Sequence, residues 1–513
     1  MDECSEARRW GDIVTPEYRD LYFGKSDSRN EANESQNDFV KSYVDLNGTS
    51  RSVVCGEKFL VLGPKGTGKS ALAWYLKATE GADRHLALVR DASSLPLAEI
   101  PRIQTGQSAG PERTVVAWKF ILLCNYLELL LRDQGCSLQN DSEVTRVSKL
   151  LRDYGFMGDA AGRALLKASS TTITIPIPKL GQIYRRESRT NLNLYNLIPY
   201  LESWVVDASS RTRHVLLLDG LDSIFLNDPS YDESLSALVQ AAYGLNQRLQ
   251  SRPSTGSIVL LLRNDIFSRM ALSLPDSQKM RDDLSLDLDW RVLSGSAGVR
   301  APLIQLVNAK AARASGIEYI EVLEYFPPNI ELNARDPASR RMPRLQYLLN
   351  LTRHTPRDLL RLFEEIRNTE AMGIYSRSVG GSLSQEVIRE GVLQYSTKYF
   401  VGAIRNEFAG FEGGPESAAA AITALQHIGK QRFDREEFCA ALSEARTIDH
   451  DKAESPDRLL TLLFYAGAIG NYVSRRGETY MQFYHRRDDS EVYLRGQFVL
   501  HNALIHAWGL HRG

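Results

Sequence analysis

The chain has 513 residues, of which 43% are hydrophobic and 24% are charged, as is ordinary for a soluble globular protein. This length predicts roughly two to four domains. The formal net charge is -1, so no global field draws the chain toward nucleic acid or a membrane, although local basic faces are not excluded.

Residues 1–50 are polar and predict a lead-in segment of loop and short helix, without the apolar core of a signal peptide. The five cysteines are scattered and include no Cys-x-x-Cys pair. This argues against a zinc site or a disulfide framework and predicts reduced thiols in a cytoplasmic protein. The most apolar window, Thr114–Asp133, contains Lys119, Asn125 and Glu128. It predicts a buried or amphipathic helix, and we expect no membrane partner.

Short apolar runs alternate with helical segments from residue 59 to about residue 266, which is typical of an α/β fold with a parallel sheet. Because the runs are unbroken, we expect strands covered on both faces, an αβα sandwich over residues 51–290. Thr171–Ser188 alternates and contains two prolines, so it predicts an edge hairpin in an insertion at about 135–190. A helix is expected at Asn191–Asp207. The predicted strands are 59–62, 86–90, 214–219 and 257–263.

Two further units are predicted after this core. Residues 291–407 form the first unit, in which Arg344–Asn368 has the period of a helix. Phe408–Ser417 is rich in glycine and predicts a linker. Residues 418–513 predict helices followed by a glycine turn and two strands, which is a winged-helix-like arrangement.

The stretch Gly63–Ser70, "GPKGTGKS", fits the phosphate-binding pattern G-x-x-x-x-G-K-[ST] at every defined position. Glycines let the backbone bring its N–H groups onto phosphates, and the following helix points its positive end at the anion. Lys69 can reach the β- and γ-phosphates, and Ser70 can bind Mg2+. A glycine turn without a ligand is the alternative. The predicted ATP-binding residues are Gly63, Pro64, Lys65, Gly66, Thr67, Gly68, Lys69, Ser70 and Ala71.

An acidic partner for this loop follows the third predicted strand. Asp219 ends the run "HVLLLD" and would hold Mg2+ through water, as a Walker B aspartate does. Its alternative role is to cap the next helix. Asp222 could position or activate the attacking water, although a purely structural role is as well supported.

Two arginines are candidate catalytic sensors of the phosphates. Arg263 follows the fourth predicted strand, where a polar residue could report hydrolysis; it could instead be a surface cation or an ion-pair partner. Arg357 lies in the first turn of a helix that Thr355 would cap and Pro356 would begin. Because arginine is unfavourable at a helix N-terminus, a nearby phosphate would explain it. Pairing with a neighbouring carboxylate is the alternative.

Together these motifs resemble the P-loop ATPases of the AAA+/STAND group, and within it the bacterial Sll1717-type ATPases. The resemblance covers most of the chain, through "LYFGKSDSRNE", "GPKGTGKS", "LLLDGLD", "LLLRNDIF", "TPRDLLRL" and "FVLHNALIHAWGL". It implies an αβα ATPase core, a helical lid at 291–407 carrying Arg357 as its sensor, and a winged helix behind it. It also implies Arg263 at the strand-end sensor position, and a role of relatives as switches in bacterial defence against phage.

One residue departs from the pattern of the AAA+ motor ATPases, which carry a glutamate directly after the Walker B aspartate. Here that residue is Gly220. Loss of a positioned general base typically costs about 10²–10⁴-fold in rate, so unless Asp222 substitutes, hydrolysis should be slow. This favours a nucleotide-dependent assembly switch with a separate effector chain over a motor.

Other functions remain open at this stage. A DNA-binding ATPase would use basic residues of the wing, and a scaffold would bind ATP without turnover. The resemblance also implies a homo-oligomer in which an arginine reaches the neighbouring nucleotide, with Arg269, Arg281 and Arg291 as candidates. His501 has no nucleophile motif near it and predicts a capping or packing residue. The basic wing residues are Arg475, Arg476, His485, Arg486 and Arg487.

Overall fold

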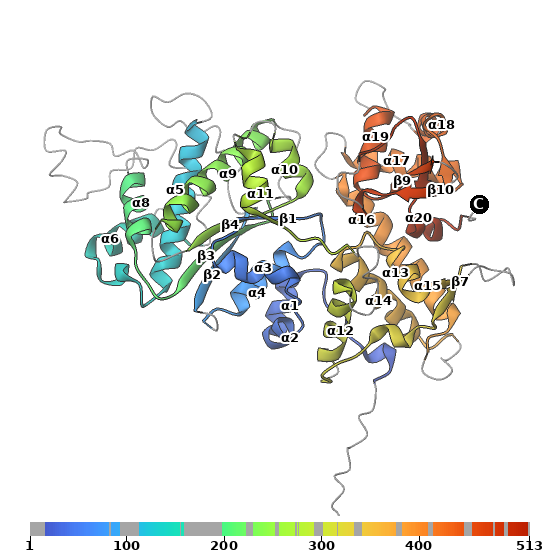
Figure 1. Ribbon diagram of the computed structural model, residues 1–513, viewed down its shortest axis with the longest axis horizontal. Coiled ribbons are helices and arrows are strands. Elements are labelled where there is room, and N and C mark those ends of the chain that lie inside the picture. Colours follow the sequence, from blue (N-terminus) through green and yellow to red (C-terminus); the bar gives the residue numbers. More distant parts are fainter. Residues whose placement is uncertain are drawn as a thin grey trace, which may run out of the picture.

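The structure, a computed structural model, has an α/β core and, beside it, residues 301–408 (here called the lid) and 414–510 (here called the C-terminal unit), which pack together around one shared hydrophobic cluster (Figure 1). The core lies to one side, and the lid and the C-terminal unit lie beside one another on the other side. The residues described are 16–81, 84–92, 112–153, 155–158, 197–221, 229–251, 256–271, 274, 276–291, 301–314, 316–332, 341–375, 382–408, 414–445, 454–475, 478–486 and 491–510.

The core is built on a five-stranded sheet in the order β2-β3-β4-β1-β5, in which all neighbouring strands are parallel. The four strands predicted from apolar runs are confirmed. The fifth, β5, was not predicted because its three residues, Ser-Leu-Asp, include only one apolar side chain. The strands are β1 (Leu60–Leu62), β2 (His85–Asp91), β3 (Arg213–Asp219), β4 (Ser257–Leu262) and β5 (Ser285–Asp287).

Helices cover both faces of this sheet, which confirms the αβα sandwich. Alternate strand residues point to opposite faces, so Leu60 and Leu62 join one hydrophobic cluster while Val61 joins another. The first cluster is completed by α5 (Glu112–Arg132), α8 (Ile198–Asp207) and α9 (Pro229–Gln250), and the second by α3 (Thr49–Val54) and α4 (Lys69–Ala78).

Helix α5 is the apolar segment singled out in the sequence. Among the described helices it alone is long and apolar enough to cross a membrane, and 67% of its most apolar window is buried inside the protein. The predicted hairpin at 171–188 lies outside the described residues. So does the start of the helix expected at 191–207, of which residues 198–207 are observed as α8. The remaining helices of the core are α6 (Ser142–Asp153), α10 (Asn264–Ala271) and α11 (Ser277–Asp283).

The N-terminal segment joins the core to the lid. Its first described turn, Tyr18–Asp20, inserts Tyr18 into the lid, where the hydroxyl donates to the carbonyl oxygen of Phe363 (3.0 Å). Helices α1 (Ser28–Glu34) and α2 (Gln36–Lys41) then pack against α4 of the core.

The lid is mostly helical, as predicted, with a short two-stranded sheet. The segment 344–368, which has a helical period, forms two helices: His354 adopts a left-handed conformation (φ 56°), and Pro356 begins the second helix, as its position after Thr355 predicted. The elements are α12 (Pro302–Ala314), β6 (Asn329–Glu331), β7 (Arg341–Pro343), α13 (Arg344–Leu349), α14 (Pro356–Ala371), α15 (Gln385–Gln394), a π-helix (Tyr395–Phe400) and α16 (Val401–Glu407).

The C-terminal unit contains the predicted helices followed by a hairpin, and also two strands, β8 and β11, that were not predicted; its antiparallel sheet runs β10-β9-β11-β8. Its winged-helix character stays a prediction. It begins at Gly414 rather than 418, since the end of the predicted linker forms the first turn of α17. The elements are α17 (Gly414–Ile428), β8 (Arg432–Phe433), α18 (Arg435–Ala445), α19 (Pro456–Tyr465), β9 (Ile469–Arg475), β10 (Glu478–Gln482), β11 (Gln497–Leu500) and α20 (Asn502–Ala507).

Candidate functional site

The predicted phosphate-binding loop connects β1 to α4. Gly66 and Gly68 have φ angles of 86° and 96°, a left-handed conformation that favours glycine. A Cβ atom on Gly63 would lie only 2.6 Å from Thr67 Oγ1. Trp290, which follows β5, donates from Nε1 to the carbonyl oxygen of Thr67 (2.8 Å). The loop is therefore tight and is fixed from the side of the sheet.

Lys69 and Ser70 are the first two residues of α4. The Lys69 side chain is largely buried, and its Nζ donates to the carbonyl oxygens of Gly63 (2.8 Å) and Pro64 (3.0 Å). The ammonium group thus lies over the loop, and the positive end of the α4 dipole adds to its charge. This is a ready-made anion site.

Asp219 ends β3 and lines the same cavity as Lys69. Its Oδ1 accepts a hydrogen bond from the backbone N–H of Gly220 (2.9 Å). Gly220 has a φ angle of 73°, so a glutamate at this position would be strained. The left-handed backbone at this position therefore favours glycine over the glutamate that motor ATPases carry there. Asp222 lies outside the described residues.

Arg263 follows β4, which lies between β1 and β3. The register pairs Leu262 with Leu62, so Arg263 comes beside the start of the phosphate loop. Its guanidinium forms a fork with Asp265 (Nε–Oδ1 and Nη2–Oδ2, both 2.9 Å), and its Nη1 lies 2.9 Å from Glu407 Oε2. The ion-pair alternative for Arg263 therefore describes this structure, and its sensor role stays a prediction.

The carboxylate of Asp265 is kept ionised by its neighbour Arg263. Burial opposes ionisation of Asp265, but the charge and hydrogen bonds of Arg263, and then the backbone N–H of Ile266, lower the pKa of that carboxyl below its ordinary value. The Asp265 side chain is nevertheless 45% exposed, so water and salt screen its pair with Arg263.

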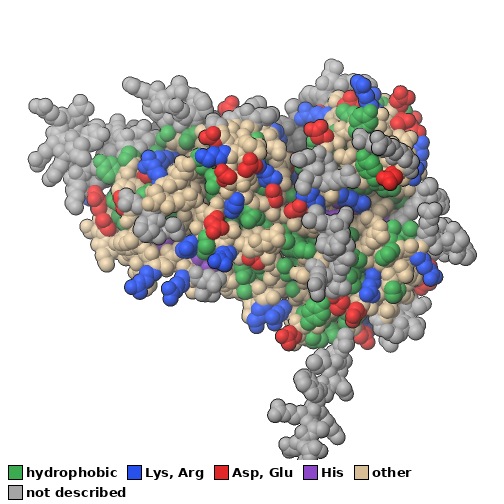
Figure 2. All heavy atoms as spheres, viewed as in Figure 1, with side chains coloured by type: hydrophobic (Ala, Val, Ile, Leu, Met, Phe, Trp, Pro, Cys, Tyr) green, Lys and Arg blue, Asp and Glu red, His purple; other side chains and the backbone are tan. Residues whose placement is uncertain are grey.

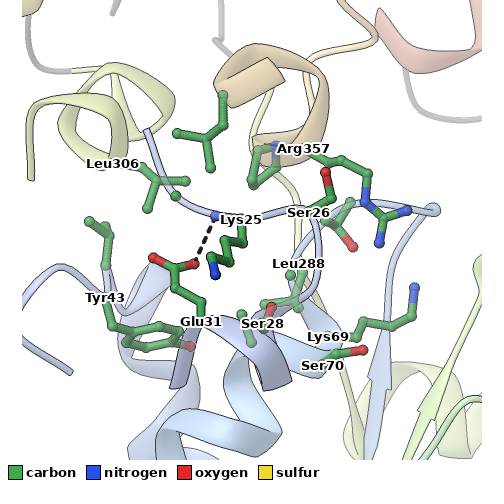
Figure 3. A pocket seen from close by; sticks show the side chains of 18 of the residues that line it. Lys25, Ser26, Ser28, Glu31, Tyr43, Lys69, Ser70, Leu288, Leu306 and Arg357 are labelled. Carbon is green, nitrogen blue, oxygen red and sulfur yellow. Dashed lines mark hydrogen bonds between the residues drawn. The ribbon is translucent and has the colours of Figure 1, made fainter. Parts of the chain in front are cut away.

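Arg357 lies in the first turn of α14, where Thr355 caps the helix by accepting from the N–H of Asp358 (3.3 Å) and Pro356 is the first residue, as predicted. The backbone N–H of Arg357 donates to the carbonyl oxygen of Gly66 (3.3 Å). Among the described residues, no carboxylate forms an ion pair with Arg357. Its side chain instead lines the cavity, on the side where Lys69 lies (Figure 3).

The N-terminal segment contributes a wall that the sequence motifs did not predict. Residues 24–28 run across the cavity, with Lys25 near its middle (Figure 3). Glu31 of α1 accepts from Lys310 of α12 in a buried ion pair (2.6 Å). Gly24 packs over this pair, since a Cβ there would lie 3.3 Å from Glu31 Oε2 and 3.5 Å from Lys310 Cδ. The core and lid are thus joined across the site.

The whole cavity encloses about 250 Å3. Its phosphate-loop end is polar and cationic, whereas Glu31, Tyr43 and Leu306 lie toward the opposite end (Figure 3). Such a gradient suits a ligand with charged and aromatic parts. The left-handed glycines and the ammonium of Lys69 fit phosphates, and Ser70 and Asp219 supply the hard oxygen ligands that Mg2+ prefers. The apolar residues that line the cavity include Phe39, Tyr43, Val44, Leu46, Leu288, Trp290, Leu306, Pro356 and Leu360.

The basic residues predicted on the wing are only partly described. His485 is packed between the rings of His354 and His501 (centroids 5.7 and 5.4 Å away), and Arg486 donates to Asn350 Oδ1 (3.0 Å). Both therefore face the lid. Three predicted wing side chains lie outside the described residues: Arg475, Arg476 and Arg487.

The remaining predicted residues have local partners. His501 caps α20, its Nδ1 accepting from the N–H of Ala503 (3.2 Å), which confirms the capping role. Each candidate arginine finger forms an ion pair within the chain: Arg269 with Asp232 (2.8 Å), Arg281 with Asp287 (2.8 Å), and Arg291 with Asp289.

No family model and no curated protein matches this sequence. Among solved structures, the crystal structure of Cdc6p from Pyrobaculum aerophilum is similar with a TM-score of 0.32 and 11% sequence identity, over 88% of this chain and 93% of that chain. The α/β P-loop fold is therefore assigned from the parallel sheet, the loop and the layers of this chain itself.

Proposed function

We propose that this protein is an ATP-binding, slowly hydrolysing P-loop ATPase that acts as a nucleotide-dependent assembly switch. The observation that carries this proposal is the contact between the lid and the phosphate loop. The N-terminus of α14 lies on Gly66, and Arg357 extends from it into the cavity. A phosphate group bound at the loop would therefore contact both the core and the lid, as a switch between two arrangements of these parts requires.

Four residues would hold the nucleotide and its metal ion in this proposal. Lys69 and Arg357 supply positive charge from the core and the lid, and Ser70 and Asp219 supply oxygen ligands for Mg2+. The bound Mg2+ would neutralise charge on the phosphates. Asp219 would hold the metal ion from the end of β3, and the N-terminus of α4 would orient the phosphates.

Slow turnover is supported by the carboxylates around the cavity. Of those lining it in the described part of the chain, Glu31 is paired with Lys310, and Glu364 is paired with Arg361 (2.7 Å). Asp219, the third, is the proposed metal ligand. None of these three is placed to act as a separate base, so water would be poorly activated unless Asp222, which lies outside the described residues, supplies one.

The resemblance supports a cytoplasmic homo-oligomer that signals to a separate effector chain in defence against phage. A DNA-binding ATPase is the alternative. On the face of the C-terminal unit seen in Figure 2, basic and acidic side chains are interspersed. Around α19, Arg458 pairs with Glu454 (3.1 Å) and Arg435 with Asp457 (2.6 Å). These pairings offer little net positive charge for a phosphate backbone, so we place the switch first.

The test combines ATP turnover with mass in solution, for wild type and Lys69→Ala, with and without duplex DNA. The switch predicts assembly of the wild type in ATP but not in ADP, with low turnover that DNA does not change. Stimulation of turnover by DNA would favour the alternative. Equal assembly of both proteins in ATP and ADP would refute the switch.

A further inference from the structure

The last turn of α16 contacts two groups beside the phosphate loop. Lys65 Nζ donates to the carbonyl oxygen of Asn406 (3.3 Å), and Arg263 Nη1 lies 2.9 Å from Glu407 Oε2. Glu407 is the last residue of α16, and the C-terminal unit begins at Gly414. The phosphate loop and the tip of β4 are therefore both joined to the helix that leads into the C-terminal unit.

Glu407 connects this tip to the lid as well. Its Oε1 lies 3.4 Å from Arg353 Nη1, and Arg353 is held by the buried Asp358 (2.8 Å). Arg353 also packs against the C-terminal unit, since a Cβ on Gly467 would lie 3.0 Å from Arg353 Cδ. The Glu407 and Arg353 side chains are each 10% exposed, so solvent and salt screen the pair weakly. One carboxylate thus bridges the arginines of the core and the lid.

The arrangement of hydrogen bonds at Arg263 allows one of them to be exchanged. Nε and Nη2 of Arg263 donate to the two carboxylate oxygens of Asp265, which fixes the guanidinium plane, whereas Nη1 pairs with Glu407. Bidentate hydrogen bonds of this kind are strong and directional. Nη1 can therefore change its acceptor while Asp265 keeps Arg263 at the tip of β4, where the small hollow that Arg263 and Glu407 line also reaches Pro64 and Lys65 of the phosphate loop.

We propose that Glu407 is a positioning residue that competes with the terminal phosphate of a nucleoside triphosphate for Arg263. The proposal rests on the proposed function, because it needs a nucleotide on the loop. With no nucleotide or with a diphosphate, Glu407 keeps Arg263 and holds α16 against the core. A triphosphate supplies a competing anion, Glu407 loses one of its two arginines, and the contact of α16 with the core is loosened, while α16 and the C-terminal unit stay packed with the lid in one hydrophobic cluster. The difference between ATP and ADP thereby becomes a difference in how firmly α16 is held against the core.

The test is hydrogen exchange of residues 401–408 in the full chain, without nucleotide, with ADP and with ATP. Wild type should exchange faster in ATP than in the other two states. Glu407→Gln, which removes the charge but keeps the shape, should exchange fast in all three. Couplings between sites typically correspond to about 5–150-fold, so we expect the ATP-to-ADP ratio of exchange rates to fall at least about fivefold. Glu416→Gln, an exposed change in α17, should behave as wild type.

Glu407→Asp keeps the charge but shortens the side chain, so that it cannot bridge both arginines; it should also lose the nucleotide dependence, and it serves if the glutamine variant does not fold. Titration with a fluorescent ATP analogue separates the two proposals. Failure of the wild type to bind it would overturn both. Binding with unchanged nucleotide dependence of exchange in both Glu407 variants would overturn the role of Glu407 alone.

Discussion

The buried carboxylate of Asp358 allows a quantitative prediction about the lid. Asp358 is fully buried and accepts hydrogen bonds from the Arg353 backbone N–H (3.0 Å), Arg353 Nε (2.8 Å) and Nη2 (2.9 Å), and the Tyr399 hydroxyl (2.8 Å). Burial alone would raise the pKa of Asp358, but Arg353 first, and then these hydrogen bonds, hold that pKa at about 2 against an ordinary value of 3.8. The carboxylate is therefore a strongly preferred, ionised partner of Arg353.

Asp358→Asn removes this charge at nearly constant volume. The depressed pKa corresponds to about 2 kcal/mol of stability, and breaking a buried ion pair costs about 3–5 kcal/mol. We therefore expect the free energy of opening of α14 to fall by about 2–5 kcal/mol, measured by native-state hydrogen exchange of its amides near pH 7. In wild type this contribution is complete above pH 3.8 and is lost as pH falls toward 2.

The matched control is Asp457→Asn, which breaks the exposed pair with Arg435 and should leave the exchange of α14 unchanged. A value for Asp358→Asn within error of wild type would refute the reasoning, because the buried Arg353 charge would then need no partner.

Two further predictions concern the phosphate loop and the junction of the lid with the C-terminal unit. Gly66→Ala adds a Cβ at a φ of 86° and 3.1 Å from Arg357 Cβ; a left-handed alanine costs about 1–2 kcal/mol, so ATP affinity measured by calorimetry should fall about 5- to 30-fold. Gly81→Ala has nearly the same φ (85°) but open space around it, and should leave affinity unchanged; equal losses would contradict a local effect. Burial, and then the nearby Arg486, lower the pKa of His501 to about 3 and that of His354 to about 4, so each is neutral when folded and protonates on unfolding below its ordinary value of 6.5. Stability is therefore complete above pH 6.5 and falls by up to about 1.4 kcal/mol per pH unit for each histidine down to pH 4. His501→Asn replaces the capping nitrogen Nδ1 with an amide oxygen that can also accept from Ala503 and should flatten this slope in urea unfolding, whereas the exposed His427→Gln should not. An unchanged slope in His501→Asn would contradict the assignment.

Much of the core could be predicted because its signals are local. The apolar runs that form β1 to β4 and the spacing of Gly63–Ser70 are each contained in a few neighbouring residues. The N-cap at Thr355 and the capping role of His501 were likewise predicted from adjacent residues. Short-range patterns of this kind follow from backbone hydrogen bonding and burial.

The remaining parts of the site depend on contacts between residues that are far apart in the sequence. Nothing near Glu31 predicts its pairing with Lys310, and nothing near Glu407 predicts that it joins two arginines of different parts. The three-residue strand β5 has too few residues for a hydrophobic pattern. Such features arise only when the lid and the N-terminal segment pack on the core.

The central claim is that Gly63–Ser70 holds the phosphates of ATP, and its most direct test is calorimetric binding of ATP with Mg2+. We predict saturable binding by the wild type and its loss in Lys69→Ala. Lys77→Ala, a lysine of the same helix that pairs with Glu80, should bind as wild type does. Absence of binding by the wild type, or undiminished binding by Lys69→Ala, would contradict the account.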